Sequence, residues 1–323
     1  MTTTALAHPN IALVKYWGKQ EKPGNLPATP NLSITLNGLT TRTTIEEIGA
    51  PPEPRQQTPV DEIQLNGKHL ADAKIAHFMR MLRTRYELPA YRICSENDFP
   101  TGAGLASSAS GFAALITAIN SKAGLNMDHE IMSEWARQGS ASAARSLFAG
   151  FVALVPPQWR AQCIAPPSHW PLTTVVAITS DEAKRVSSTD GMERSRKTSA
   201  YYNAWVRSSG EDFAAATQAI TERDFTALTE VAELSCLKMH GLMMSSVPSL
   251  AYWNAATVTC MHTIRQLRKD GVDVFFTIDA GPQIKAICLP DSADDVAQAL
   301  NNAPGVLRTI RCGMGDGAQV ITP

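Results

Sequence analysis

The stretch PTGAGLASSASG, residues 100–111, carries no charged side chain and only one large apolar one. Its glycines can adopt backbone angles that are closed to other residues, and its small side chains would let several backbone N–H groups converge. Apolar positions from Phe112 to Ile119 recur at helical spacing, so a helix begins behind the run and directs its free N–H groups at it. These features predict an anion site suited to phosphate. A close-packed turn before a core helix is the alternative.

The composition is that of a globular protein of two ordinary domains or one large one. Of its 323 residues, 44% are hydrophobic and 18% are charged, and the net charge of −1 gives no indication of a nucleic-acid partner. Six widely spaced cysteines form no CxxC pair, so neither a zinc site nor a disulfide framework is indicated, and a cytoplasmic location is expected. No membrane partner is expected, because no apolar run reaches the roughly 18 residues of a membrane helix, and the N-terminal residues are a poor signal peptide.

Apolar patterning predicts an α+β chain, because β-rich segments come first, helical segments follow, and both types mix at the end. The predicted strands cover residues 10–17, 91–97, 173–179 and 318–322. The predicted helices cover residues 71–85, 112–124, 128–146, 190–207, 211–222, 224–240 and 250–269.

Two hairpins are predicted where a short turn separates two β-type segments. Residues 32–48 turn at Asn37-Gly38, and residues 275–289 turn at a Gly-Pro pair. The proline-rich, weakly charged stretch 155–171 predicts a boundary between one domain at 1–171 and another at 172–323.

The run 100–111 resembles the phosphate-loop motif of the GHMP kinases along its whole length. Other stretches are similar to diphosphomevalonate decarboxylases: HPNIALVKYWGK (8–19), GSASAARSLFAGF (139–151), SSTDGM (187–192) and FFTIDAGPQI (275–284). The resemblance implies the GHMP two-domain α+β architecture. Its N-terminal domain would resemble domain 2 of ribosomal protein S5, and its C-terminal domain would be ferredoxin-like.

The resemblance implies that the glycine run wraps the phosphates of ATP. The run is not a Walker A loop, because no Gly-Lys-Ser/Thr follows, and Ser107 stands where the dinucleotide fingerprint needs its third glycine. Two serine hydroxyls at its end would meet phosphate oxygens or Mg²⁺. The implied ATP-binding residues are Pro100, Gly102, Gly104, Leu105, Ala106, Ser107 and Ser108, the last two also being the implied metal contacts.

Three charged residues have both a structural and a catalytic interpretation. Asp279 ends an apolar strand, either as a turn former or, by resemblance, as the catalytic group on the substrate's tertiary hydroxyl. Lys15 is either an edge lysine with a solvated ammonium or, by resemblance, a catalytic cation beside that aspartate. Arg145 is either part of a surface salt bridge or, by resemblance, the bidentate partner of the carboxylate that is lost as CO₂.

The resemblance also implies contacts to the rest of the substrate. Tyr16 and Lys19 would contact its diphosphate, and Lys74 stands where relatives place an arginine that clamps the terminal phosphate. Thr29 would replace the asparagine of a family motif, LPxNxS, which puts one phosphate contact in question. The implied substrate-binding residues are Asn10, Tyr16, Lys19, Lys74, Ser140, Ser142, Arg145, Ser188 and Thr189.

Other polar residues are predicted to be structural. His240 and Trp17 are expected mainly to pack in the core. A loose basic cluster is predicted to be mostly a solvated helix face: Lys184, Arg185, Arg194, Arg196 and Lys197.

The implied reaction is ATP-dependent decarboxylation of mevalonate 5-diphosphate to isopentenyl diphosphate, with ADP, phosphate and CO₂ as further products. The γ-phosphoryl group would pass to the tertiary hydroxyl, and loss of phosphate and CO₂ would form the alkene. A homodimer is expected by resemblance. Two alternatives stay open: a phosphomevalonate decarboxylase or mevalonate 3-kinase-like enzyme, and a non-catalytic nucleotide-binding module.

Overall fold

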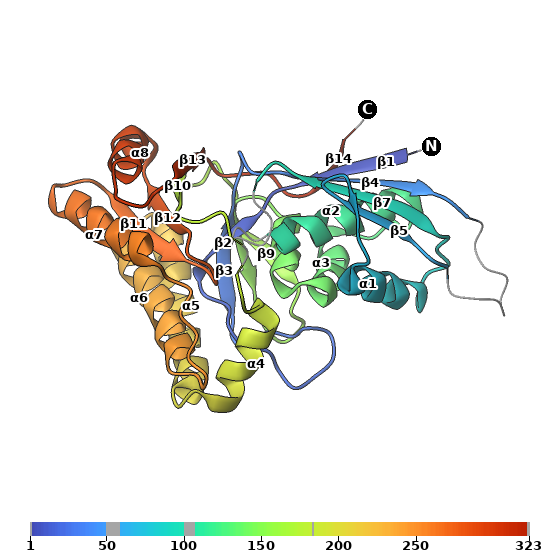
Figure 1. The fold of residues 1–323 in the computed structure, drawn as a ribbon, viewed down its shortest axis with the longest axis horizontal. Helices are drawn as coiled ribbons and strands as arrows, with labels where there is room; N and C mark the ends of the chain where they lie inside the picture. The colour runs from blue at the N-terminus through green and yellow to red at the C-terminus, as the bar shows by residue number, and fades with distance from the viewer. Residues whose placement is uncertain (1, 50–58, 100–106, 183, 322–323) are drawn as a thin grey trace.

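The structure, a computed structural model, describes residues 2–49, 59–99, 107–182 and 184–321. Three β-sheets carry the fold, with helices packed on them (Figure 1). The mixture of helices and strands confirms the predicted α+β class. Residues 50–58 and most of the glycine run, residues 100–106, lie outside the described residues.

The first sheet has six strands in the order β14-β1-β4-β7-β5-β6. Helix α2 packs on β1 and β4, and helices α1 and α3 contact each other beside it (Figure 1). The apolar face of α2 is buried against this sheet, as its helical spacing predicts. The bounds are β1 Thr2–Ala7, β4 Thr41–Glu47, β5 Glu62–Leu65, β6 Lys68–His69, β7 Tyr91–Asn97, β14 Gln319–Ile321, α1 Ala73–Arg83, α2 Ser107–Lys122 and α3 His129–Gly139.

The second sheet has four antiparallel strands in the order β2-β3-β8-β9 and lies in the middle of the molecule (Figure 1). Strands β2, β3 and β8 are buried at every position, so even the alternating polar residues of β3, Asn31, Ser33 and Thr35, lie inside the molecule. A short 3₁₀ helix, η1, precedes β8 and packs on α2 and α3. The bounds are β2 Asn10–Val14, β3 Asn31–Thr35, η1 Ala141–Leu147, β8 Phe151–Leu154 and β9 Ala161–Ala165.

The third sheet has four antiparallel strands in the order β11-β12-β10-β13. Numbered along the chain, this is the order 2-3-1-4 of a ferredoxin-like βαββαβ unit, with four helices inserted after the first strand. Helices α7 and α8 cover one face, and α6 contacts both β11 and β2. The bounds are β10 Thr173–Ile178, α4 Ser188–Thr198, α5 Tyr202–Glu222, α6 Phe225–Met244, α7 Ala255–Lys269, β11 Val274–Ile278, β12 Ile284–Cys288, η2 Pro290–Ser292, α8 Ala293–Asn301 and β13 Arg308–Cys312.

One hydrophobic cluster joins the second and third sheets. Ile11, Leu32 and Phe151 come from the second sheet, and they pack in the same buried cluster as Phe275 and Ile287 of the third. Burial of this continuous apolar surface fixes the two halves of the chain against each other. The polar residues at the ends of these strands therefore face each other across a fixed distance.

The last strand returns to the sheet in which the chain began. Strand β14, predicted from residues 318–322, pairs antiparallel with β1, and Thr4 lies opposite Ile321. Figure 1 shows both termini at the same end of the molecule. The division into domains at 1–171 and 172–323 stays a prediction, and β14 lies with the first of them.

The predicted hairpin at 32–48 is wrong. Strand β3 pairs with β2 and β8, whereas β4 pairs with β1 and β7 in a different sheet. A later segment separates the two arms, because the backbone N–H of Asn37 donates to the carbonyl of Gly313, and Leu36 bridges Met314. The predicted hairpin at 275–289 is confirmed by the antiparallel pair β11 and β12.

The helix predicted over 128–146 is confirmed as far as Gly139, but its continuation to 146 is wrong. Helix α3 ends at Gly139, because Ser140 adopts extended angles (φ −154°, ψ 123°) before the 3₁₀ turn η1 begins. The two helices predicted at 190–207 and 211–222 are instead divided after Thr198, and α5 runs unbroken through Gly210. At Gly210 a small residue suggested a boundary that does not exist, whereas at Gly139 a real helix end was missed.

Candidate active site

A cavity of about 620 Å³ opens between the two halves of the chain. One wall comes from the ends of β2, α1, α2 and η1, and the other comes from α4, α6 and the turn after β11. Every predicted site residue that the structure describes lines this cavity. These residues are Asn10, Lys15, Tyr16, Lys19, Lys74, Ser107, Ser108, Ser140, Ser142, Arg145, Ser188, Thr189 and Asp279.

The remaining predicted ATP contacts belong to the glycine run. Pro100, Gly102, Gly104, Leu105 and Ala106 lie outside the described residues, so their ATP-binding role stays a prediction. The helix that the run was predicted to precede does begin at Ser107, on the wall of the cavity. The backbone N–H groups of its first turn have no partners within the helix, which leaves them for a ligand.

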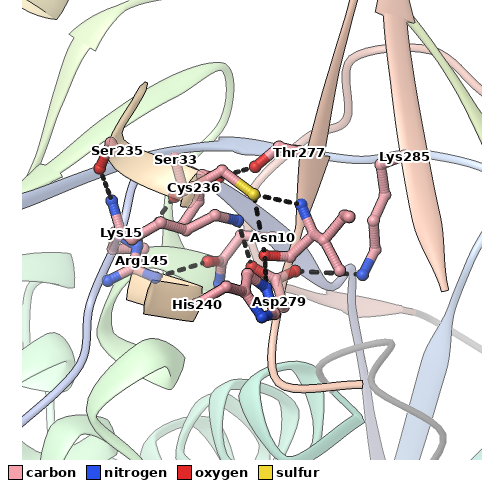
Figure 2. Close-up of polar contacts among 12 residues, drawn as sticks. Asn10, Lys15, Ser33, Arg145, Ser235, Cys236, His240, Thr277, Asp279 and Lys285 are labelled. Carbon is pink, nitrogen blue, oxygen red and sulfur yellow. Dashed lines mark hydrogen bonds and ion pairs between the residues drawn. The ribbon is translucent and has the colours of Figure 1, made fainter. Parts of the chain in front are cut away.

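Asp279 is held between two lysines, which approach it from opposite sides in Figure 2. The Nζ of Lys15 donates to Oδ1 at 2.6 Å, and the Nζ of Lys285 lies 3.3 Å from Oδ2. Burial by itself raises the pKa of this carboxyl, but Lys15 and Lys285 together outweigh it and hold the pKa well below its usual range. Asp279 is therefore a carboxylate at neutral pH.

Strand register explains why these three groups meet. Thr277 in β11 lies opposite Lys285 in β12, and Asp279 follows Thr277 by two residues on the same face of the sheet. Lys15 follows the end of β2, where its backbone N–H donates to Ser235 of α6 at 2.9 Å. The interpretation of Lys15 as a solvated edge lysine is wrong, because only 1% of its side chain is exposed.

Arg145 lies on the opposite wall, with 2% of the residue exposed. Its Nε donates to Ser33 at 2.9 Å, and its terminal nitrogens donate to Asn31 and to Asn10. Three of the five guanidinium N–H groups are thus used, which leaves two for a ligand. Within the described part of the chain no carboxylate forms an ion pair with Arg145, so the surface salt-bridge interpretation is wrong.

Burial governs the electrostatics of Arg145. It lowers the pKa of the guanidinium to about 10, although Asp279 and Tyr16 act in the opposite direction. Its hydrogen-bond partners here are neutral oxygens, which orient the group and leave its charge uncompensated. The arrangement therefore suits an anionic ligand in the cavity, above all a carboxylate, which matches the planar fork.

Asn10 orients Arg145 more than it faces the cavity. Its Nδ2 donates to the Ser142 carbonyl at 2.9 Å and to Ser146 at 2.8 Å, while its Oδ1 accepts from Arg145 at 3.0 Å. Asn31 and Ser33 were missed by the sequence reasoning. The sequence did contain a pattern that could have found them. Asn31-Leu32-Ser33 has the N-x-S spacing of the family motif LPxNxS and begins two residues after Thr29, which was compared with the asparagine of that motif.

A second group of cations gathers at the other end of the cavity. Lys19, Lys74 and Lys184 all line it, and each lies near enough to influence another. Burial, and then the charge of Lys74, lowers the pKa of Lys19. Burial first, with Lys74 and Lys285, lowers the pKa of Lys184 to about 8, although Asp279 raises it. Three cations that destabilise one another form a site for a highly charged anion.

Lys184 corrects one prediction, because it belongs to this wall and not to a solvated helix face. Its Nζ donates to Ser188 at 2.6 Å and to the Ala280 carbonyl at 3.2 Å. Arg196 fits the prediction better, because it forms ion pairs with Glu193 and Glu21. No periodicity in the sequence distinguished Lys184 from its neighbours.

Hydroxyl groups complete the cavity wall. Ser140 lies between Ser108, at 3.3 Å, and Ser142, at 3.2 Å, measured between their Oγ atoms. The hydroxyl of Tyr16 is buried and has no hydrogen-bond partner within the described part of the chain. A buried hydroxyl beside a cavity without a partner is a group that a bound ligand would satisfy.

Trp17 and His240 pack against other residues of the site. Trp17 is 1% exposed, and its indole donates to Ser195 at 2.9 Å. His240 stacks on Trp253 at 4.6 Å and lies 3.2 Å from the Ile278 carbonyl, next to Asp279 in the chain. Burial lowers the pKa of His240 to about 3, so the ring is neutral. Both residues pack as predicted.

A second cavity of about 180 Å³ adjoins the first and shares Lys74, Ser107 and Ser108 with it. Its other walls are mostly apolar or neutral, with Ile75, Phe112 and side chains of β4, β5 and β7 among them. The two cavities together suit a ligand with a flat apolar end and a polyanionic end. Across the described ranges, no cluster of three His, Cys, Asp or Glu side chains is placed to hold a metal ion by itself.

The fold and the site define a class of protein: a two-part α+β protein of the GHMP kinase type, with a cationic cavity between its halves. Two family models match the chain. One is described as diphosphomevalonate decarboxylase-like N-terminal domain and matches residues 7–165. The other is described as mevalonate 5-diphosphate decarboxylase C-terminal domain and matches residues 174–312. The chain belongs to the diphosphomevalonate decarboxylase family.

Individual relatives agree with this assignment. The diphosphomevalonate decarboxylase of Candida albicans is 33% identical over 308 residues, which cover 87% of this chain and 82% of that protein. The Staphylococcus aureus mevalonate diphosphate decarboxylase structure has a TM-score of 0.89 at 30% identity, with 99% and 98% of the two chains covered. The structure of MDDEF with MVAPP, AMPPCP and magnesium also has a TM-score of 0.89, at 32% identity, with 100% and 99% covered.

No helix among the described residues is long and apolar enough to cross a membrane.

Proposed function

We propose that this protein catalyses the ATP-dependent decarboxylation of mevalonate 5-diphosphate to isopentenyl diphosphate, ADP, phosphate and CO₂. Family membership supports this function, and so does the solution of a similar structure with MVAPP and the ATP analogue AMPPCP. One observation supports the proposal most strongly. The ionised Asp279 and the uncompensated guanidinium of Arg145 line the same cavity, which suits a substrate with a reacting hydroxyl and a carboxylate.

Asp279 and Lys15 would act on the tertiary hydroxyl. The carboxylate orients this hydroxyl and accepts its proton as the oxygen bonds to the γ-phosphorus and the bond from phosphorus to ADP breaks. Lys15, 2.6 Å from the carboxylate, offers positive charge to the group in transfer. Because phosphate leaves a carbon far more readily than hydroxide does, phosphorylation prepares the second half of the reaction.

Arg145 would hold the substrate's carboxylate through the second half. Loss of phosphate leaves the tertiary carbon electron-poor, and the electron pair of the bond to the carboxylate then forms the alkene as CO₂ departs. Arg145 keeps the carboxylate aligned with this bond, and Asn10, Asn31 and Ser33 keep Arg145 in place. This chain therefore contributes orientation and charge more than strong base chemistry.

The cations at the far end of the cavity would bind phosphate groups. Lys19, Lys74 and Tyr16 are proposed to bind the substrate's diphosphate, with Ser140, Ser142, Ser188 and Thr189 around it. The second cavity, next to Ser107 and Ser108, would take the nucleoside end of ATP. Besides burial, the charge of Lys74 lowers the pKa of both Lys19 and Lys184, which supports a polyanion here. Bound with ATP, Mg²⁺ would neutralise phosphate charge, with Ser107 and Ser108 the proposed hydroxyls nearest to it.

One panel of assays tests the function. ADP and CO₂ release are measured with mevalonate, its 5-phosphate and its 5-diphosphate. We expect both products in equal amounts with the 5-diphosphate. ADP without CO₂ would indicate a 3-kinase, turnover of the 5-phosphate alone would indicate a phosphomevalonate decarboxylase, and nucleotide binding without ADP release would indicate a binding module.

The preference for the diphosphate follows from the cations that face it. Each charge-assisted hydrogen bond contributes roughly 1.5–3 kcal/mol, so two lost contacts predict a preference of at least about 100-fold over the monophosphate. Thr29 lies outside the cavity wall, and Lys74 offers one ammonium where relatives offer a fork. A ratio of kcat/KM values near one for the two substrates would contradict the preference while leaving the roles of Asp279 and Arg145 intact.

We also propose that the protein is a cytoplasmic homodimer, divided into domains near residue 171. All six cysteines are free, which is consistent with a reducing compartment. Exposed apolar side chains such as Leu234, Val247 and Val258 offer surface that a second copy would cover. Light scattering on the purified protein measures the mass directly, and a single 34.9 kDa species would contradict the dimer.

A further inference from the structure

Lys285 is a fully buried lysine in a strand that is otherwise apolar. It is the second residue of β12, and all five residues of this strand are buried. The exposed fraction of its side chain is 0%, and its Nζ lies 3.3 Å from Oδ2 of Asp279. An ammonium in such a place is strongly destabilising unless an anion lies beside it. An apolar residue at position 285 would cost less free energy to bury, so the presence of a lysine there needs a physical reason.

The two lysines on Asp279 differ in their access to the cavity. Lys15 lines the cavity wall, whereas Lys285 does not. Lys15 can therefore meet a ligand phosphate, and when it does, it shares its charge between that phosphate and Asp279. Lys285 lies behind the carboxylate and cannot reach a ligand. Its charge stays with Asp279 whatever occupies the cavity.

We propose that Lys285 is a positioning residue for the reaction, which keeps the Asp279 carboxylate ionised and fixed in plane while Lys15 interacts with the ligand. The proposal rests on the function proposed above. Strand geometry supports it, because Lys285 lies opposite Thr277 in the register of β11 and β12. Its side chain is thereby directed along the sheet face from which Asp279 projects (Figure 2).

Apart from Lys15, the other titratable groups near Asp279 among the described residues either form no ion pair with it or are uncharged. Arg145 and Lys184 act on the carboxylate from a distance across the cavity, and neither forms an ion pair with it among the described residues. Helix α6 contributes Cys236 and His240, of which His240 is neutral because burial lowers its pKa to about 3. Burial also raises the pKa of Cys236, so that thiol stays protonated. Among the described residues, Lys15 and Lys285 are the two cations that form ion pairs with the carboxylate.

The first test substitutes Lys285→Met, which keeps the length of the side chain and removes its charge. We expect kcat to fall by about 10²-fold, with KM for both substrates within about threefold of the wild type, because a misplaced reacting group costs rate and not binding. Lys238→Met is the matched control, since Lys238 pairs with Asp212 at 2.8 Å and lines neither cavity. Unchanged kcat in Lys285→Met would overturn the proposal.

The second test separates positioning from a purely structural role. We expect the acidic limb of the kcat profile to move up by about one pH unit or more in Lys285→Met, because an opposite charge is lost beside the carboxylate. The substrates' phosphates titrate alike in both enzymes, so the difference reports the enzyme. A variant that melts earlier but keeps the wild-type pH profile would make Lys285 structural only. Lys285→Gln is used if Lys285→Met does not fold.

A third measurement needs no turnover. The ¹³Cγ resonance of Asp279, assigned by its loss in Asp279→Asn, is titrated in the wild type and in Lys285→Met. An upward shift in the titration midpoint of the variant supports the proposal, and coincident midpoints overturn it. If the wild type releases no ADP or CO₂ but the midpoint shifts, the proposed function fails while the charge coupling of Lys285 to Asp279 stands.

Discussion

Asp279 is an aspartate whose surroundings pull its pKa in two directions. Burial favours the neutral acid, but the two contacting lysines favour the carboxylate more strongly, so the pKa is lowered. Lys15 donates to Oδ1 and Lys285 forms an ion pair at Oδ2, so the group is ionised before any ligand binds. A preorganised carboxylate needs little rearrangement in the transition state.

Asp279→Asn tests this residue directly. The amide keeps the size of the side chain but cannot accept a proton, so kcat should fall by about three orders of magnitude or more while ATP binding persists. Steady-state kinetics and calorimetric binding of an ATP analogue measure the two effects. Asp294→Asn, on the surface at α8, is the control. Near wild-type turnover of Asp279→Asn would remove the aspartate from the mechanism.

Arg145→Lys tests the fork geometry of the guanidinium. A lysine keeps the charge but cannot donate to Ser33, Asn31 and Asn10 and also hold a carboxylate at two points. We expect kcat/KM to fall by about 10²-fold or more. Arg308→Lys, at an exposed pair with Asp181, should change little. Equal effects of the two substitutions would contradict the role of Arg145.

Lys184 predicts how the reaction responds to alkaline pH. With its pKa lowered to about 8, the ammonium is protonated below that pH and attracts phosphate, and above it the free enzyme loses this charge. The kcat/KM value should therefore fall as the pH rises through about 8. Lys184→Arg should flatten this limb, because an arginine stays charged across the range. If the alkaline limb of the kcat/KM profile is unchanged in Lys184→Arg, the titration near pH 8 belongs to another group.

At the scale of elements, the break between α3 and η1 positions the site. A continuous helix over 128–146, as predicted, would have pointed the Arg145 side chain in a different direction. Instead Gly139 packs flat on the ring of Phe112 in α2, Ser140 extends, and η1 directs Arg145 between β2 and β3. A close approach of backbone to ring thus sets the direction of the Arg145 side chain.

Gly139→Ala should disturb both stability and activity. A Cβ at residue 139 would lie 2.3 Å from Cδ1 of Phe112, so α3 and α2 must separate. We expect a loss of about 1–3 kcal/mol in the free energy of unfolding and a drop in kcat. Gly210→Ala is the matched control, since nothing lies within 4 Å of its Cβ and alanine favours the helix. Thermal unfolding and kinetics of both variants check the prediction.

At the scale of the whole molecule, the chain closes on itself. Strand β14 covers the edge of β1, and one apolar cluster joins the second and third sheets, so the cavity lies between rigid walls. The ion pair of Lys15 and Asp279 joins residues 264 apart in the chain and links the two walls of the cavity.

Removal of residues 319–323 tests the closure. The truncation deletes β14, exposes the edge of β1 and should lower the melting temperature by several degrees, consistent with loss of three ladder positions. Because β14 lines neither cavity, kcat at low temperature should stay within about threefold of the wild type. Removal of 322–323 alone is the control. An unchanged melting temperature would show that the edge pairing contributes little.

Much of the fold could be predicted from short-range patterns. The helical face from Phe112 to Ile119, the strand at 173–179 and the hairpin at 275–289 depend on neighbours within a few residues, and the structure confirms them. The hairpin at 32–48 failed because its pattern was equally compatible with other partners. Residues 313–315 took those hydrogen bonds, and local sequence carries no information about a competitor so far away.

The candidate site shows the same division. Motifs of adjacent residues were enough to predict the positions of Asp279 and Arg145. That Lys285, Lys184 and Asn31 lie with them, and that Lys15 is buried, became evident only in the folded chain. Burial and charge pairing depend on which surfaces are brought together. Those surfaces come from strands and helices that are far apart in the chain and adjacent only in the folded molecule.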